Sequence, residues 1–195
     1  MKLDFPGYKN HHQGRPAVVF GKGPSLDLRP PAPPGAITIG VNNVGEYVPV
    51  MYSLACDGLP VKPTGKIAHF SGVPASPQSK EGRQTPFVIH QGAIWFLHVP
   101  DPNREYPATR FTRSQVATTR YLTAASSSAQ PAIHLAWYMG CTSLMLIGVD
   151  GKGGYAKTIG KEFGRSPSYR YASMKKDTMH VAYVLFGNAV TDLSN

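Results

Sequence analysis

The chain is poor in cysteine, and it has no long run of apolar residues. Its 195 residues include only Cys56 and Cys141, which lie far apart and lack the Cys-x-x-Cys spacing of redox or zinc sites. This usage predicts a reduced, cytoplasmic protein with two buried thiols rather than a secreted protein stabilised by disulfides. No apolar stretch approaches the roughly 18 residues of a transmembrane helix, and the N-terminal residues lack the hydrophobic segment of a signal peptide. We therefore expect no membrane span.

Acidic residues are also scarce. Lys and Arg total 20 against 11 Asp and Glu, which gives a net charge of +9. This excess favours anionic partners, namely nucleotides, polyphosphates, nucleic acid or acidic glycans, and does not choose among them. General solubility is the alternative explanation. The length fits one domain with a full core, and we expect a single nucleotide-binding α/β domain over residues 1–195, with residues 1–15 as an N-terminal arm.

Two familiar phosphate-binding motifs are missing as well. The apolar run 17–20 predicts a short buried strand, and Gly-Lys-Gly-Pro-Ser-Leu follows it at 21–26. Leu26 stands where a dinucleotide fingerprint needs its third glycine, and no Walker A loop is present. Two glycines after a strand still allow a tight turn and a close approach to a ligand, and their amides can form an anion-binding concavity. The pattern predicts a phosphate or nucleotide site at the first strand, with a plain tight turn as the alternative.

Further strands follow in order. Residues 36–42 predict a second strand ending in Asn42 and Asn43, which share the edge of the glycine loop if the strands are parallel. A third strand is expected at 51–56. The stretches 66–70, 87–90 and 93–99 also favour strands, whereas 71–86 is typical of a loop.

The clearest unit lies near position 140. Ser126, Ser127 and Ser128 are predicted to supply N-cap oxygens, Pro131 fits a first helical turn, and Gly140 ends the helix. The continuous apolar run within 142–150 then predicts a strand buried on both faces, closing on Asp150.

The last third combines a basic loop with a helix. Residues 151–170 hold five glycines, five Lys or Arg and one acid, and predict a mobile basic lid or a disordered surface loop. A helix is expected from Ser173 to Phe186, followed by a short strand at 188–193.

These separate pieces carry a family resemblance. The Gly-Lys-Gly-Pro-Ser-Leu run resembles the Gly-Asn-Gly-Pro-Ser-Leu signature of bacterial sialyltransferases of glycosyltransferase family 42 and of the related 6-hydroxymethylpterin pyrophosphokinase-like family. Residues 39–43 are similar to the second-strand segment whose Asn meets the nucleotide. The serines at 126–128, the segment 146–150 and the Tyr-Ala at 155–156 resemble the distal block. The match covers roughly residues 15–58 and 120–193.

The resemblance implies a Rossmann-like, mainly parallel sheet of the glycosyltransferase type A variant kind and a nucleotide-activated sugar as donor, with a CMP-sugar as the family precedent. Tyr155, with Tyr169 or Tyr171, would donate hydrogen bonds to the departing phosphate. No Asp-x-Asp motif occurs, so Lys152, Lys157, hydroxyls and backbone dipoles would meet the leaving-group charge without an obligatory metal. The implied nucleotide-binding residues are Gly21, Lys22, Gly23, Pro24, Ser25, Asn42, Asn43, Ser126, Ser127, Ser128, Asp150 and Lys152.

Two positions depart from the family pattern. Lys22 stands where the family has an Asn, which adds a positive charge. The family's catalytic His precedes the last helix, where this chain has the residues 169–173, so His180 is the nearby candidate for the base. A partly buried helix residue is the alternative interpretation of His180.

Two other functions stay open. A pyrophosphokinase-like enzyme would use ATP with Mg²⁺ held by Asp57 and Asp150. A non-catalytic protein would sequester a nucleotide or bind nucleic acid through arginines of the middle region, and a modified-DNA acceptor for a sugar would reconcile the charge with the fold. The size and the Gly- and Pro-rich loops fit a phage-encoded protein. The arginines are Arg104, Arg110, Arg113 and Arg120.

Overall fold

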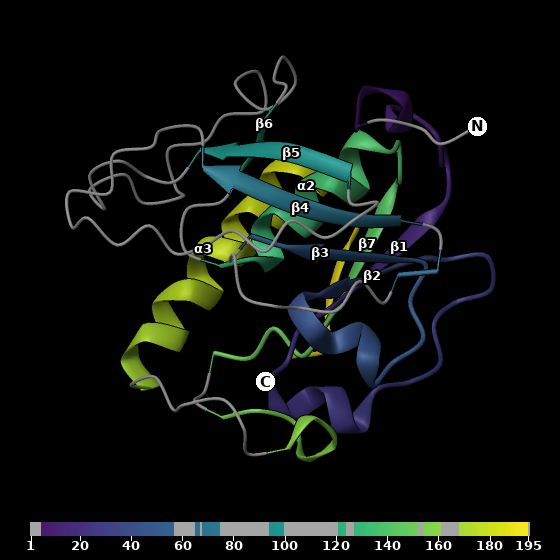
Figure 1. Ribbon diagram of the computed structural model, residues 1–195. Helices are drawn as coiled ribbons and strands as arrows, with labels where there is room; N and C mark the ends of the chain where they lie inside the picture. The colour runs from purple at the N-terminus through teal and green to yellow at the C-terminus, as the bar shows by residue number, and fades with distance from the viewer. Residues whose placement is uncertain are drawn as a thin grey trace.

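The computed structural model describes residues 5–56, 65–66, 68–74, 94–99, 121–123, 127–151, 154–160 and 168–194. The strands in this part of the chain form one eight-stranded sheet in the order β6-β5-β4-β3-β2-β1-β7-β8, and every neighbouring pair is parallel (Figure 1). This confirms the predicted α/β, Rossmann-like class. The strands are β1 (Pro16–Phe20), β2 (Ile37–Val41), β3 (Tyr52–Ala55), β4 (Ala68–Pro74), β5 (Ile94–Val99), β6 (Tyr121–Thr123), β7 (Ser143–Ile147) and β8 (Val190–Asp192).

β1 lies inside the sheet, between β2 and β7. From β1 the chain moves outward through β2, β3, β4 and β5 to β6, and it then returns across the sheet to β7 on the other side of β1. The direction of winding therefore reverses between β1 and β7. In open α/β sheets such a topological switch marks the crevice, outside the carboxyl ends of the strands, where ligands bind.

Helices cover both faces of the sheet. α2 (Ala129–Tyr138) and α3 (Ser168–Phe186) pack on the face that carries Val19, while η2 (Pro24–Leu28), η3 (Asn42–Glu46) and η5 (Lys157–Ile159) contribute to the core on the face of Val18. Because alternate residues of a strand point to opposite faces, both of these valines are fully buried. This explains why the β1 segment is apolar throughout rather than alternating.

α2 begins and ends much as predicted, but its N-terminus is capped differently. Pro131 lies in the first turn, and Gly140, with a φ of +85°, ends the helix. The side chain of Ser128 makes no capping hydrogen bond, so the expected cap is wrong at this residue. The hydroxyl of Ser127 instead lies 3.0 Å from Oγ1 of Thr178 on α3, because α3 packs against this end of α2.

Two boundaries and one strand differ from expectation. β4 continues to Pro74, so residues 71–74 of the expected loop are strand, paired with β5. β6 was not expected. α3 begins at Ser168 rather than Ser173, and residues 168–170 therefore belong to the helix and not to the lid. The expected strand at 87–90 lies outside the described residues.

Residues 5–15 are fastened to the core at Tyr8 and His12, although most of their side chains are exposed, as expected of an arm or surface loop. This segment includes η1 (Phe5–Tyr8), and Tyr8 and His12 are buried at 4% and 7% exposure. Backbone hydrogen bonds from Asn10 N–H to the carbonyl of Tyr138 (3.0 Å) and from His12 N–H to that of Met139 (2.7 Å) fasten it to the end of α2. These contacts join positions far apart in the chain, so the polar composition of the segment gave no sign of them.

Candidate functional site

The loop after β1 packs directly against the loop after β7. The amide of Gly21 donates to the carbonyl of Ile147 (2.7 Å), and the amide of Gly23 donates to that of Gly148 (2.7 Å). These two amides were expected to line an anion-binding concavity, but here they hold the two loops together. A Cβ at position 21 would overlap the carbonyl of Gly148, so the glycine is needed for this approach. We call residues 21–25 the glycine loop and residues 148–151 the β7 loop.

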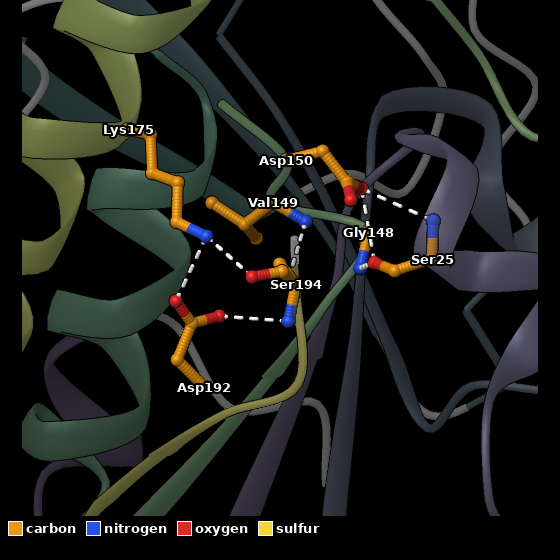
Figure 2. A network of polar contacts seen from close by, with 7 residues as sticks. All are labelled: Ser25, Gly148, Val149, Asp150, Lys175, Asp192 and Ser194. Carbon is orange, nitrogen blue, oxygen red and sulfur yellow. Dashed lines mark hydrogen bonds and ion pairs between the residues drawn. The ribbon is translucent and has the colours of Figure 1, made fainter. Parts of the chain in front are cut away.

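Ser25 and Asp150 join the two loops through side chains (Figure 2). The Ser25 hydroxyl donates to the Asp150 carboxylate (2.9 Å) and accepts from the amide of Gly148 (2.9 Å), while the Ser25 amide also reaches the carboxylate (3.3 Å). The same carboxylate lies over Gly23, where a Cβ would meet Asp150 Cγ at 2.7 Å. Both residues were predicted for the site, and the structure brings them together at the topological switch.

The second half of this network comes from residues that the sequence did not single out. The amide of Val149 donates to the hydroxyl of Ser194 (2.9 Å), and the amide of Ser194 donates to Asp192 (2.9 Å). Lys175 of α3 forms an ion pair with Asp192 (3.0 Å) and donates to the carbonyl of Ser194 (Figure 2). The last strand and α3 thus support the β7 loop. No local pattern reveals a pairing between a helix lysine and a distant strand aspartate.

Lys22 and Tyr155 meet beside the glycine loop. The Lys22 ammonium lies 5.0 Å from the centroid of the Tyr155 ring, and the amide of Ala156 donates to the carbonyl of Lys22 (2.9 Å). Residues 154–160 of the predicted lid are therefore fastened, whereas its residues 152–153 and 161–167 lie outside the described ranges.

Asp27 fastens the same segment from η2. Its carboxylate accepts hydrogen bonds from the amides of Lys157 (2.6 Å) and Thr158 (3.1 Å) and from the Thr158 hydroxyl. The Thr158 hydroxyl, helped by these amides, lowers the pKa of Asp27 because the bonds favour the charged form. Sequence reasoning missed Asp27, although an acid in the first turn of a short helix is a common capping residue.

Asn42 and Asn43 follow β2 at the same edge of the sheet. Phe20 pairs with Gly40 in parallel register, so the glycine loop and Asn42 both begin within two residues of this pair. Asn42 adopts a left-handed conformation with a φ of +56°. The side-chain oxygens of both asparagines are buried and have no hydrogen-bond partner among the described residues. Leaving a buried oxygen without a hydrogen bond costs about 1–3 kcal/mol of folding stability. A ligand that donates hydrogen bonds to these two oxygens would recover this energy.

Among the described residues, Ser127, Ser128 and His180 do not join this cluster. Ser127 and Ser128 lie at the carboxyl edge but make no hydrogen bond to the glycine loop or to Asn42 in the described part of the chain. His180 follows Thr178 by two residues, which is about 200° around the helix, so it points away from the contact with Ser127. Its buried Nε2 has no partner among the described residues. Tyr169 and Tyr171 lie in the first turn of α3.

Several predicted residues lie outside the described ranges, namely Ser126, Lys152, Asp57 and the four arginines of the middle region. Within those ranges, no three His, Cys, Asp or Glu side chains gather as a metal site would require. A hollow of about 280 Å³ lies at the opposite, amino-terminal edge of the sheet, and Lys9, Gln13, Trp137 and Tyr138 are among its lining residues. None of these was predicted for the site.

No helix in the described ranges has the length and apolar character needed to cross a membrane. Comparison with protein-family models found no family that matches the chain, and comparison with curated proteins found no match.

Proposed function

We propose that the carboxyl edge of the sheet at β1, β2 and β7 binds a nucleoside phosphate, and that the protein is a nucleotide-dependent transferase with a nucleotide-activated sugar as donor. The observation that carries this proposal is the position of the glycine loop, at the point where the strand order reverses. The choice of a sugar donor follows the resemblance of the Gly-Lys-Gly-Pro-Ser-Leu run to glycosyltransferase family 42.

The chemistry of the edge supports a phosphate-bearing ligand. Lys22 brings a positive charge to the end of β1, and the Tyr155 ring lies beside it. The carboxamides of Asn42 and Asn43 supply hydrogen-bonding groups at the end of β2, suited to a base or a sugar. In a transfer reaction the Lys22 charge would stabilise the departing nucleotide phosphate, with hydroxyl groups assisting and without an obligatory metal.

The test is a binding and turnover screen on the purified protein. Nucleosides, nucleoside monophosphates, nucleotide sugars and ATP, each with and without Mg²⁺, are compared by thermal shift and calorimetry. We expect a nucleoside monophosphate and its sugar conjugate to bind without Mg²⁺. Lys22→Met should weaken that binding by on the order of 1.5–3 kcal/mol, because it removes a charged contact. Lys66→Met is the matched control. Lys66 is exposed, and it precedes β4 at the opposite, amino-terminal edge of the sheet.

Each other outcome has a distinct meaning. Magnesium-dependent turnover of ATP would favour the pyrophosphokinase-like alternative. Tight nucleotide binding without turnover of any nucleotide sugar, with glycans or DNA as acceptors, would favour sequestration. A flat response to every nucleotide and nucleotide sugar would overturn the proposal.

A further inference from the structure

The glycine loop has few of its own amides left for a ligand. Gly21 and Gly23 donate to carbonyls of β7 and the β7 loop, and Ser25 donates to Asp150. Pro24 has no amide hydrogen. The positive charge that this loop can turn towards an anion is therefore the side chain of Lys22, a residue that departs from the resembled family.

Lys22 and Tyr155 are held in a fixed register. The hydrogen bond from Ala156 N–H to the carbonyl of Lys22 (2.9 Å) joins the two backbones next to both side chains. The Lys22 ammonium then lies 5.0 Å from the ring centroid, within the range of about 6 Å in which a cation is attracted to a ring face.

The segment that carries the ring is itself anchored. Ala156 and Ile159 of this segment are buried in the core at 1% and 2% exposure. The Asp27 carboxylate accepts hydrogen bonds from the amides of Lys157 and Thr158. The ring is thus presented by a fixed backbone, so it can limit the rotamers of a long, flexible lysine side chain. A lysine that is already restricted loses less entropy when it binds an anion.

We propose that Tyr155 is a positioning residue for Lys22: its ring face holds the ammonium at the end of β1, and its hydroxyl is dispensable for binding the phosphate. This inference rests on the proposed nucleotide site, and it assigns to Tyr155 a role different from the hydroxyl donor that the family resemblance implies. An ammonium held against a ring face keeps its positive charge, and this charge attracts a phosphate oxygen.

The test separates ring from hydroxyl with Tyr155→Phe and Tyr155→Leu, together with Lys22→Met and the double variant Lys22→Met/Tyr155→Leu. The probes are AMP, CMP, GMP and UMP with their matching nucleosides, measured by calorimetry. We expect Tyr155→Phe to bind the preferred monophosphate within about twofold of wild type. Tyr155→Leu should bind it about five- to tenfold more weakly while its nucleoside affinity is unchanged. The double variant should bind no more weakly than Lys22→Met. A general loss of packing would weaken nucleoside and nucleotide alike.

A second measurement needs no ligand. The ring of Tyr155 should shift the Lys22 ε-methylene resonance upfield in wild type and in Tyr155→Phe, and this shift should vanish in Tyr155→Leu. Absence of the shift in wild type would overturn the inference, as would equal loss of affinity in the Phe and Leu variants. If the shift is present but no monophosphate binds, the ring contact stands while the proposed function and the phosphate role fail together.

Discussion

Gly21 and Gly148 approach so closely that a Cβ on either residue would overlap the carbonyl oxygen of the other. The contact is reciprocal, and it lies at the topological switch between β1 and β7. Gly148 also has a φ of +73°, a backbone conformation that residues other than glycine rarely adopt.

Gly148→Ala should therefore lower the free energy of unfolding by about 3 kcal/mol or more, since it combines backbone overlap with strain. Gly35→Ala is the matched control, because Gly35 has a similar φ of +72° but nothing within 4 Å of an added Cβ. The control should lose only about 1 kcal/mol. Urea unfolding measures both, and equal losses would show that the two loops are not in contact.

The strands of this region could be predicted because their signals are local. The runs of β1, β2 and β7 are apolar and end in glycine or asparagine, and the parallel pairing that places them at one edge follows from burial on both faces. The role of Gly21 and Gly23 could not be predicted, because a sequence does not show whether a free amide meets a ligand or a carbonyl from a distant strand.

The pair formed by His12 and Tyr52 predicts a dependence of stability on pH. Nε2 of His12 lies 2.5 Å from the Tyr52 hydroxyl, and burial, with the charges of His11 and Arg15, lowers the pKa of His12 to about 4. In the unfolded chain the histidine pKa is near 6.5. Between about pH 6.5 and pH 4, His12 is therefore protonated in the unfolded chain but neutral in the folded protein. The contribution of His12 is complete above about pH 6.5 and is lost as the pH falls towards about 4, by up to about 3 kcal/mol.

His12→Gln should flatten this dependence, as measured by urea midpoints between pH 7 and pH 4. His11→Gln is the comparison and should flatten the dependence only in part, because burial lowers the pKa of His12 more than the His11 charge does. A profile as steep in His12→Gln as in wild type would show that other groups cause the loss.

The polar network around the β7 loop makes a prediction about two serines. Ser25→Ala would leave the Gly148 amide, and Ser194→Ala the Val149 amide, buried without an acceptor. Each should cost about 1–3 kcal/mol of unfolding free energy. Ser128→Ala should change it by less than about 0.5 kcal/mol, because that side chain makes no capping bond. If all three variants unfold at the same urea concentration as wild type, the network contributes no stability.

The hydrogen bonds that Asp27 accepts should keep residues 154–160, the segment that carries Tyr155, ordered. Asp27→Ala should speed hydrogen exchange at the amides of Lys157 and Thr158, which lose their acceptor, without changing exchange in β1. In wild type this protection should persist below the ordinary pKa of an aspartate, because the same bonds lower the pKa of Asp27 and keep it charged. Glu46→Ala, an exposed acid on η3, is the control and should leave both amides protected.

The candidate site was predicted better in its parts than in its arrangement. Lys22, Ser25, Asp150 and Tyr155 were predicted from separate segments, and all four lie at the switch between β1 and β7. The burial of Tyr8 in the core, and the support of the β7 loop by α3 and the last strand, depend on contacts across the whole chain. Composition and periodicity carry no information about such partners.

The contacts between the glycine loop and the β7 loop join residues far apart in the sequence, and this affects the order in which the protein folds during synthesis. Ser25 and Gly148 are 123 residues apart, so β1 emerges from the ribosome long before the strand that completes its pairing. Until then β1 has an unpaired edge, next to a loop whose amides lack their final acceptors. The candidate binding edge is thus among the last regions to assemble, and a nascent chain that stops before β7 should have no nucleotide affinity.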